Sequence, residues 1–176
     1  MSSQQPAAAL PPILVAQLHH NAWAIEKMIE RCRKLTHEQY TAEFEIGLGS
    51  LQRTLTHLVE AIFYFADVFN RRPYRPRMVL MNAATPTDLR SPLELADGAL
   101  RESLAAFLAK HDLDEPIEFP KGGGDFVAAF AAIAQIFDHG AHHRAQMLNM
   151  LRHLGELGDF SVDPLRWAGV MPVSAP

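Results

Sequence analysis

Two histidines near the C-terminal third of the chain have the residue type and spacing that suit metal binding. His139 and His143 stand four residues apart, and on an α-helix such residues share one face with Cβ atoms about 5–6 Å apart. Imidazole nitrogens bind zinc at about 2.0–2.1 Å, so one helix can supply two ligands to one ion. Surface helices also carry such pairs without binding a metal, and the spacing alone leaves both alternatives open.

The third histidine of this cluster, His142, is expected to face solvent. With about 100° of rotation per helical residue, the apolar stripe of this segment is centred near Gly140 and Arg144, and His142 falls nearly opposite. His139 and His143 lie on the flank of the stripe, where helix bundles build their sites. Arg144 lies near the stripe centre, which favours a structural contact buried between helices.

An earlier segment offers a matching histidine. His57 sits on the flank of an apolar stripe that runs from Leu51 to Phe69. If the two segments form neighbouring helices, His57 completes a set of three histidines, and three protein ligands with an open position are typical of catalytic zinc sites. Tyr64 lies two helical turns beyond His57, where it lines a pocket or packs in the core.

Four amphipathic segments predict long helices, at about residues 12–35, 51–70, 92–108 and 126–154. We expect Ser50, Ser91 and Asp125 as N-caps and Gly155 as the C-terminal stop of the last helix. An extended piece fits only between Pro116 and Pro120. The expected core stripe of the last helix comprises Phe126, Phe130, Ile133, Phe137, Met147, Leu151 and Leu154.

Helices without a convincing strand pattern predict an all-α fold, an antiparallel four-helix bundle with long connections. We expect a flexible N-terminal tail at residues 1–11, a single domain over 12–176 and an irregular C-terminal cap from residue 160. The connection at 71–91 is long enough to be functional. Glycines 122–124 are interpreted as a hinge, because the residues of a phosphate-binding loop do not follow them.

Composition argues against several function classes. The 176-residue chain has a net charge of −4, and its main basic cluster, at residues 71–77, is broken by prolines, so we expect no nucleic-acid binding. The sequence has neither a signal-peptide pattern nor an apolar run of about 18–20 residues, so we expect a cytoplasmic protein that does not enter membranes. Its single cysteine, Cys32, permits no internal disulfide. The arginines on either side of it could lower the pKa of its thiol and make it reactive; the alternative is an inert thiol.

Three segments together resemble the DinB-like superfamily of metal-binding four-helix bundles, which includes the DinB and YfiT types. They are Asn21–Ala24, Gly49–Leu58, which contains His57, and Phe137–Met147, which contains the other two histidines. The resemblance covers about residues 12–168. Ala145 stands where the family commonly has glycine, and alanine is the better helix former.

The resemblance implies that His57, His139 and His143 are the metal ligands and that His142 is not. It implies a divalent transition metal, with zinc or nickel ahead of iron or manganese, because imidazole suits several such ions. It further implies a metal-dependent enzyme that uses the ion to activate a thiolate or water. This enzyme would be a thiol transferase or a related enzyme, such as a hydrolase. The partners would be a small-molecule thiol, an electrophile and a second copy of the chain in a homodimer. A non-catalytic metal-binding or stress-response protein on the same scaffold is the alternative, because the sequence offers no obvious general base beside the metal.

Overall fold

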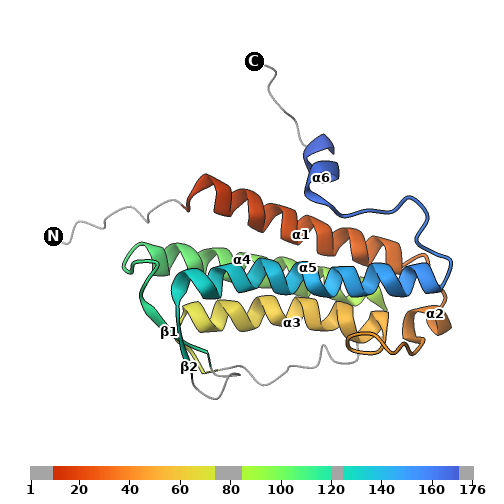
Figure 1. Ribbon diagram of the computed structural model, residues 1–176, viewed down its shortest axis with the longest axis horizontal. Helices are drawn as coiled ribbons and strands as arrows, with labels where there is room; N and C mark the ends of the chain where they lie inside the picture. The colour runs from red at the N-terminus through yellow and green to blue at the C-terminus, as the bar shows by residue number, and fades with distance from the viewer. Residues whose placement is uncertain (1–9, 74–84, 120–124, 171–176) are drawn as a thin grey trace.

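The computed structural model describes residues 10–73, 85–119 and 125–170. Four long helices form a bundle, α1 (Pro12–Cys32), α3 (Leu51–Phe69), α4 (Arg90–Leu108) and α5 (Ala129–His153) (Figure 1). The smaller elements are α2 (His37–Thr41), the 3₁₀ helix η2 (Pro86–Leu89), the strands β1 (Pro116–Phe119) and β2 (Asp125–Ala128), and α6 (Pro164–Val170). The all-α prediction is therefore confirmed. Most of the expected N-terminal tail, residues 74–84 of the long connection and the glycine hinge lie outside the described residues.

The four helices do not all alternate in direction. The C-terminal ends of α3 and α4 lie together, because the Phe69 and Phe107 ring centroids are 5.4 Å apart and Asn70 Nδ2 donates to Ser103 Oγ at 2.5 Å. These two helices therefore run parallel, while each is antiparallel to α1 and α5 (Figure 1). A short turn would force neighbouring helices to be antiparallel; the long connection between α3 and α4 instead returns the chain to the end where α3 began.

Helix α3 forms as its sequence predicts. Ser50 is extended, and its hydroxyl accepts a hydrogen bond from the Arg53 backbone N–H at 3.2 Å, which caps the first turn. The expected stripe faces the core, and its members are Leu51, Leu55, Leu58, Ile62, Phe65 and Phe69, all buried. The helix that carries His57 is thus fixed by both its cap and its apolar face.

The start of α5 differs from the prediction. Asp125 is not an N-cap, because residues 125–128 form β2, which pairs antiparallel with β1, and the helix begins at Ala129. Phe126 and Phe130 are 69% and 54% exposed, so the expected core stripe is wrong at its first two positions. The buried face begins instead with small residues, Ala129 and Ala132, which allow close packing but contribute little to a hydrophobic pattern.

The start of α4 also differs from the prediction. Ser91 is not its N-cap, because η2 leads directly into the helix at Arg90. The capping interaction lies earlier, where Asp88 accepts a hydrogen bond from the Thr85 backbone N–H at 2.9 Å. The polar residues that cap this part of the chain, Thr85 and Asp88, therefore begin the 3₁₀ helix η2 and not α4 itself.

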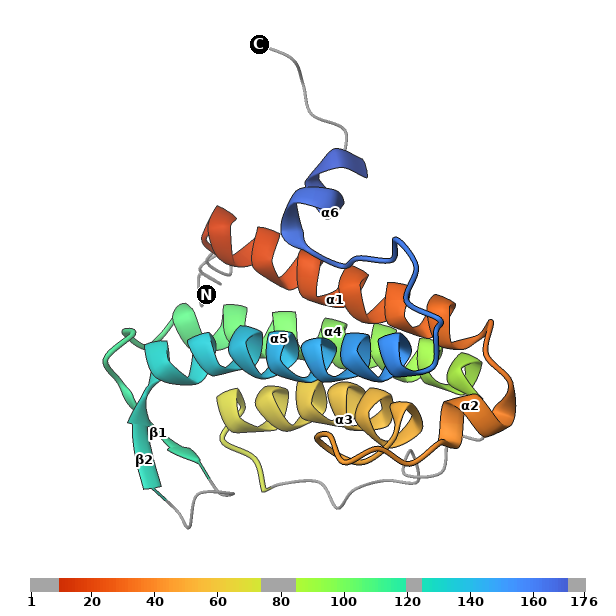
Figure 2. The ribbon, with the colours of Figure 1, turned by 45° about the vertical axis from the view of Figure 1, so that its right-hand side comes forward.

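The C-terminal segment is more regular than the expected irregular cap, because it contains α6. Figure 2 shows α6 lying against α1 on the outside of the bundle. The ring of His20 on α1 holds this segment, since its Nε2 is 2.9 Å from the Val162 carbonyl oxygen and its ring packs against Trp167.

Two features of the helices bear on the remaining expectations. No described helix combines the length and apolar character that crossing a membrane requires.

Cys32 is buried at the end of α1, and this burial raises the pKa of its thiol to about 12, although the nearby Arg31 acts in the opposite direction. The structure thus supports the inert alternative for this cysteine.

Candidate metal centre

Three histidine side chains from two helices meet at one point of the bundle. His57, His139 and His143 each offer a ring nitrogen, and these atoms all lie within 4.8 Å of one another. The Nε2 atoms of His57 and His139 are 3.0 Å apart. Within residues 10–73, 85–119 and 125–170, this is the one group of three or more His, Cys, Asp or Glu residues with such a geometry. Glu60 and Asp138 do not belong to it.

The packing of α3 against α5 produces this meeting. His139 and His143 are one helical turn apart on α5, with ring centroids separated by 4.5 Å, and His57 faces both from α3 at 4.9 and 4.7 Å. The side chain of His142 is exposed as predicted, but its ring lies next to that of His143, with centroids 5.2 Å apart. The structure therefore brings together the three histidines that the sequence selected, and it places His142 outside the group.

Gln146 orients one of the three imidazoles. Its side-chain oxygen Oε1 lies 2.8 Å from His143 Nδ1, and its Nε2 donates to His142 Nε2 at 2.8 Å. Because Oε1 can only accept, the proton of a neutral His143 sits on Nδ1, and the lone pair is left on Nε2. Metal-binding histidines are commonly held in this way through their second nitrogen. A role for Gln146 was not predicted from the sequence, although its position three residues after His143, on the same face of the helix, is a signal that indicates it.

Gly47 allows the preceding loop to approach Gln146 closely. A Cβ atom at this position would lie 2.2 Å from Gln146 Oε1, and the backbone φ angle is +56°. A side chain here would thus collide with the amide that orients His143, in a backbone conformation that non-glycine residues rarely adopt. The loop before α3 therefore contributes to the geometry of the histidines.

Burial keeps His143 in the neutral form that a metal requires. Its exposed fraction is 9%, and burial is the largest cause of a lowered pKa. The nearby His142 also lowers the pKa of His143, while the hydrogen bond to Gln146 opposes the shift. A lowered pKa leaves the imidazole unprotonated at neutral pH, with its lone pair available for a ligand.

The donor set fits a divalent transition ion. Two nitrogens bound tetrahedrally to one zinc ion lie about 3.3 Å apart for bonds of about 2.0–2.1 Å, close to the 3.0 Å between His57 and His139 Nε2. Imidazole nitrogens suit zinc, nickel, iron and copper, whereas calcium and magnesium prefer oxygen ligands. The three nearby histidines are thus compatible with binding of a divalent metal in general.

Aromatic side chains border the cluster. The Phe65 ring packs edge-on against His139, with centroids 6.0 Å apart. Tyr64 is buried, and its ring packs against Phe65 and Phe119. These contacts place Tyr64 in the aromatic core next to Phe65. Whether Tyr64 also lines a substrate pocket at the metal centre stays a prediction.

Arg144 lies beside the cluster and has the buried structural contact that the sequence indicated. Its Nη1 donates to Asn21 Oδ1 on α1 at 2.6 Å, and burial lowers the pKa of the guanidinium to about 10. Gly140 makes room for this contact, since a Cβ there would be 2.6 Å from Asn21 Oδ1. This role of Asn21 was not predicted from the sequence; the signal for it is a polar residue within the apolar stripe of α1.

Known proteins share this architecture. The chain is 25% identical over 142 residues to the protein DinB of Bacillus subtilis (strain 168), a match that covers 77% of this chain and 83% of that protein. Its fold is similar to the crystal structure of a DinB-like protein from Bacillus cereus ATCC 10987, with a TM-score of 0.61, 19% identity, and coverage of 81% of this chain and 91% of that one. The model of the DinB family matches residues 7–158. The chain therefore belongs to the DinB family.

Proposed function

We propose that His57, His139 and His143 bind one divalent transition metal ion, with zinc or nickel ahead of iron or manganese. The convergence of three ring nitrogens within 4.8 Å supports this proposal most directly. The lowered pKa of His143 and its hydrogen bond to Gln146 support it further, because both favour a neutral imidazole with a free Nε2. Neutral ligands leave the charge of the ion uncompensated.

We further propose that the protein is a metal-dependent thiol S-transferase or a related enzyme. A bound ion would supply positive charge that lowers the pKa of a coordinated thiol or water. The protein would contribute fixed ligand positions through Gln146 and an apolar border through Phe65, which limits access of water to the ion. The substrates would be a small-molecule thiol and an electrophile.

A second candidate is a non-catalytic metal-binding or stress-response protein. Among the described residues, no carboxylate joins the three imidazoles, so a general base next to the metal does not come from the cluster itself. This observation favours the second candidate, whereas the charge retained by a metal with three neutral ligands favours the enzyme.

Metal analysis of the purified protein tests the binding proposal. We expect about one divalent ion per chain in the wild type and its loss in His57→Ala and His139→Ala. The matched control is His142→Ala, which removes a neighbouring but exposed imidazole and should leave the metal in place. Equal metal content in all four proteins would exclude the proposed ligands.

An assay with a panel of thiols and electrophiles then separates the two candidates. Turnover that disappears on chelation and returns with the metal supports the transferase. A metal-loaded protein without turnover across the panel supports the non-catalytic candidate. The predicted homodimer can be tested on the same samples by sedimentation, which gives the mass of the particle in solution.

A further inference from the structure

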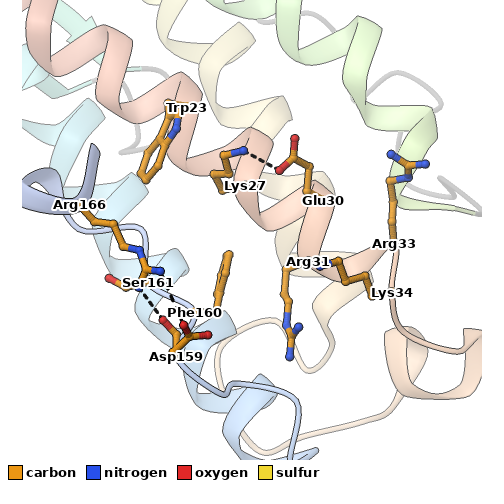
Figure 3. Close-up of a pocket in the computed structure, with 10 residues that line it drawn as sticks. All are labelled: Trp23, Lys27, Glu30, Arg31, Arg33, Lys34, Asp159, Phe160, Ser161 and Arg166. Carbon is orange, nitrogen blue, oxygen red and sulfur yellow. Dashed lines mark hydrogen bonds and ion pairs between the residues drawn. The ribbon is translucent and has the colours of Figure 1, made fainter. Parts of the chain in front are cut away.

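A separate hollow lies between α1 and the segment that leads into α6 (Figure 3). Its volume is about 650 Å³, within the range of about 300–1,000 Å³ that is usual for small-molecule sites. The three histidines do not line it. Its lining residues are Trp23, Lys27, Glu30, Arg31, Arg33, Lys34, Asp159, Phe160, Ser161 and Arg166.

The lining carries an excess of positive charge. It includes five cationic and two anionic side chains, although the whole chain has a net charge of −4. Lys27 pairs with Glu30 at 2.7 Å, and Arg166 faces Asp159 at 3.8 Å, so both anionic side chains are already engaged. Positive charge concentrated in a concavity raises the local concentration of anions.

Three cations remain to provide this excess. Within the described part of the chain, Arg33 and Lys34 form no ion pair or side-chain hydrogen bond. Arg31 has a contact of 3.5 Å from Nη2 to Glu156, at the outer limit of a hydrogen bond, and its buried Nε has no acceptor among the described residues. The guanidinium thus has hydrogen-bonding capacity that the described residues do not use.

Aromatic rings form the apolar part of the hollow. Figure 3 shows Trp23 on α1 and Phe160 on the C-terminal segment, with Arg31 and Lys34 farther along α1, whereas the side chain of Arg33 points away from both rings. The wall that carries Phe160 is held in place nearby, because His20 contacts the Val162 carbonyl oxygen at 2.9 Å and packs against the Trp23 ring. A flat apolar group can contact these rings while an attached anion reaches Arg31 and Lys34.

We infer that this hollow binds a small organic anion, in which a flat apolar group carries a phosphate or carboxylate. The rings of Trp23 and Phe160 would contact the flat group, and Arg31 and Lys34 would bind the anion. This second site has no residue in common with the proposed metal centre and does not depend on the proposed function.

Calorimetric titration with 1-naphthyl phosphate tests the inference. We expect saturable binding that requires both parts of the probe, so inorganic phosphate and 1-naphthalenemethanol should each bind more weakly by about tenfold or more. 1-Naphthoate shows whether a carboxylate serves as well as a phosphate. The variant Lys34→Glu replaces an exposed lysine of the hollow. It should weaken binding of 1-naphthyl phosphate by about tenfold, because a glutamate repels the anion that the lysine attracts.

The matched control is Lys110→Glu, the same substitution at an exposed lysine at the end of α4, away from the hollow. It should leave the affinity unchanged. Arg31→Gln should weaken binding without altering the circular dichroism spectrum, and His57→Ala should have no effect. The inference is overturned if 1-naphthyl phosphate does not bind, if either fragment binds equally well, or if the two lysine variants lose affinity to the same extent.

Discussion

Replacing Gly140 by alanine should destabilise the protein, although alanine is the better helix former. In α5, the new Cβ would lie 2.6 Å from Asn21 Oδ1 and 2.8 Å from Arg144 Nη1. These are the two atoms of the hydrogen bond that joins α1 to α5. The bond cannot keep its present geometry with a methyl group at that position, and Arg144 is only 7% exposed, so water does not readily replace the lost acceptor.

The magnitude follows from two opposing effects. Alanine in place of a helical glycine contributes about 0.5–1 kcal/mol of stability. Loss of a buried hydrogen bond to a charged group costs about 1.5–3 kcal/mol. The net expectation for Gly140→Ala is a loss of about 0.5–2.5 kcal/mol, which corresponds to a lower Tm by about 1–10 °C for a chain of this size.

Gly98 provides the matched control, because it also lies within a long helix but a Cβ there would meet nothing within 4 Å. Gly98→Ala should therefore raise the free energy of unfolding by up to about 1 kcal/mol. Chemical denaturation of both variants measures the two signs directly. If Gly140→Ala stabilises the protein as much as Gly98→Ala does, the proposed role of the Asn21–Arg144 contact is refuted.

Three further changes probe the site and the core. Gln146→Ala should weaken metal binding about 10–100-fold in a chelator competition, because the orienting contact to His143 is lost; unchanged affinity would show that the contact is dispensable. Gly47→Ala should also weaken metal binding, since it collides with Gln146, whereas Gly158→Ala, at a similar φ of +54° but in open space, should not. Cys32, whose buried thiol has a pKa near 12, should react with a disulfide reagent at pH 8 only after unfolding; rapid labelling of the native protein would contradict its burial.

The bundle and the histidine geometry could be predicted because they depend on helical periodicity. The spacing of His139 and His143, with their offset from the apolar stripe, placed them on a helix–helix contact. His57 was found by the same offset on α3. Periodicity also predicted the exposure of His142, since a rotation of about 100° per residue moves an adjacent side chain to another part of the helix surface, although its ring still lies 5.2 Å from that of His143.

Other features depend on contacts that a pattern within one segment does not contain. The start of α5 was misplaced because Phe126 and Phe130 extend the apparent stripe, whereas pairing of β2 with β1 decides where the helix begins. The parallel direction of α3 and α4 depends on the path of a long connection. The contact between Asn21 and Arg144 joins residues on two helices, so neither segment alone could show it.

The metal centre is tested most directly by locating the ion. Crystals of the protein loaded with zinc or nickel, with data collected at the absorption edge of the metal, would show whether an anomalous peak lies between α3 and α5. We predict one peak per chain, bonded to ring nitrogens of His57, His139 and His143 at about 2.0–2.1 Å. A metal-loaded crystal without a peak at these three imidazoles, or with the ion held elsewhere, would contradict the account.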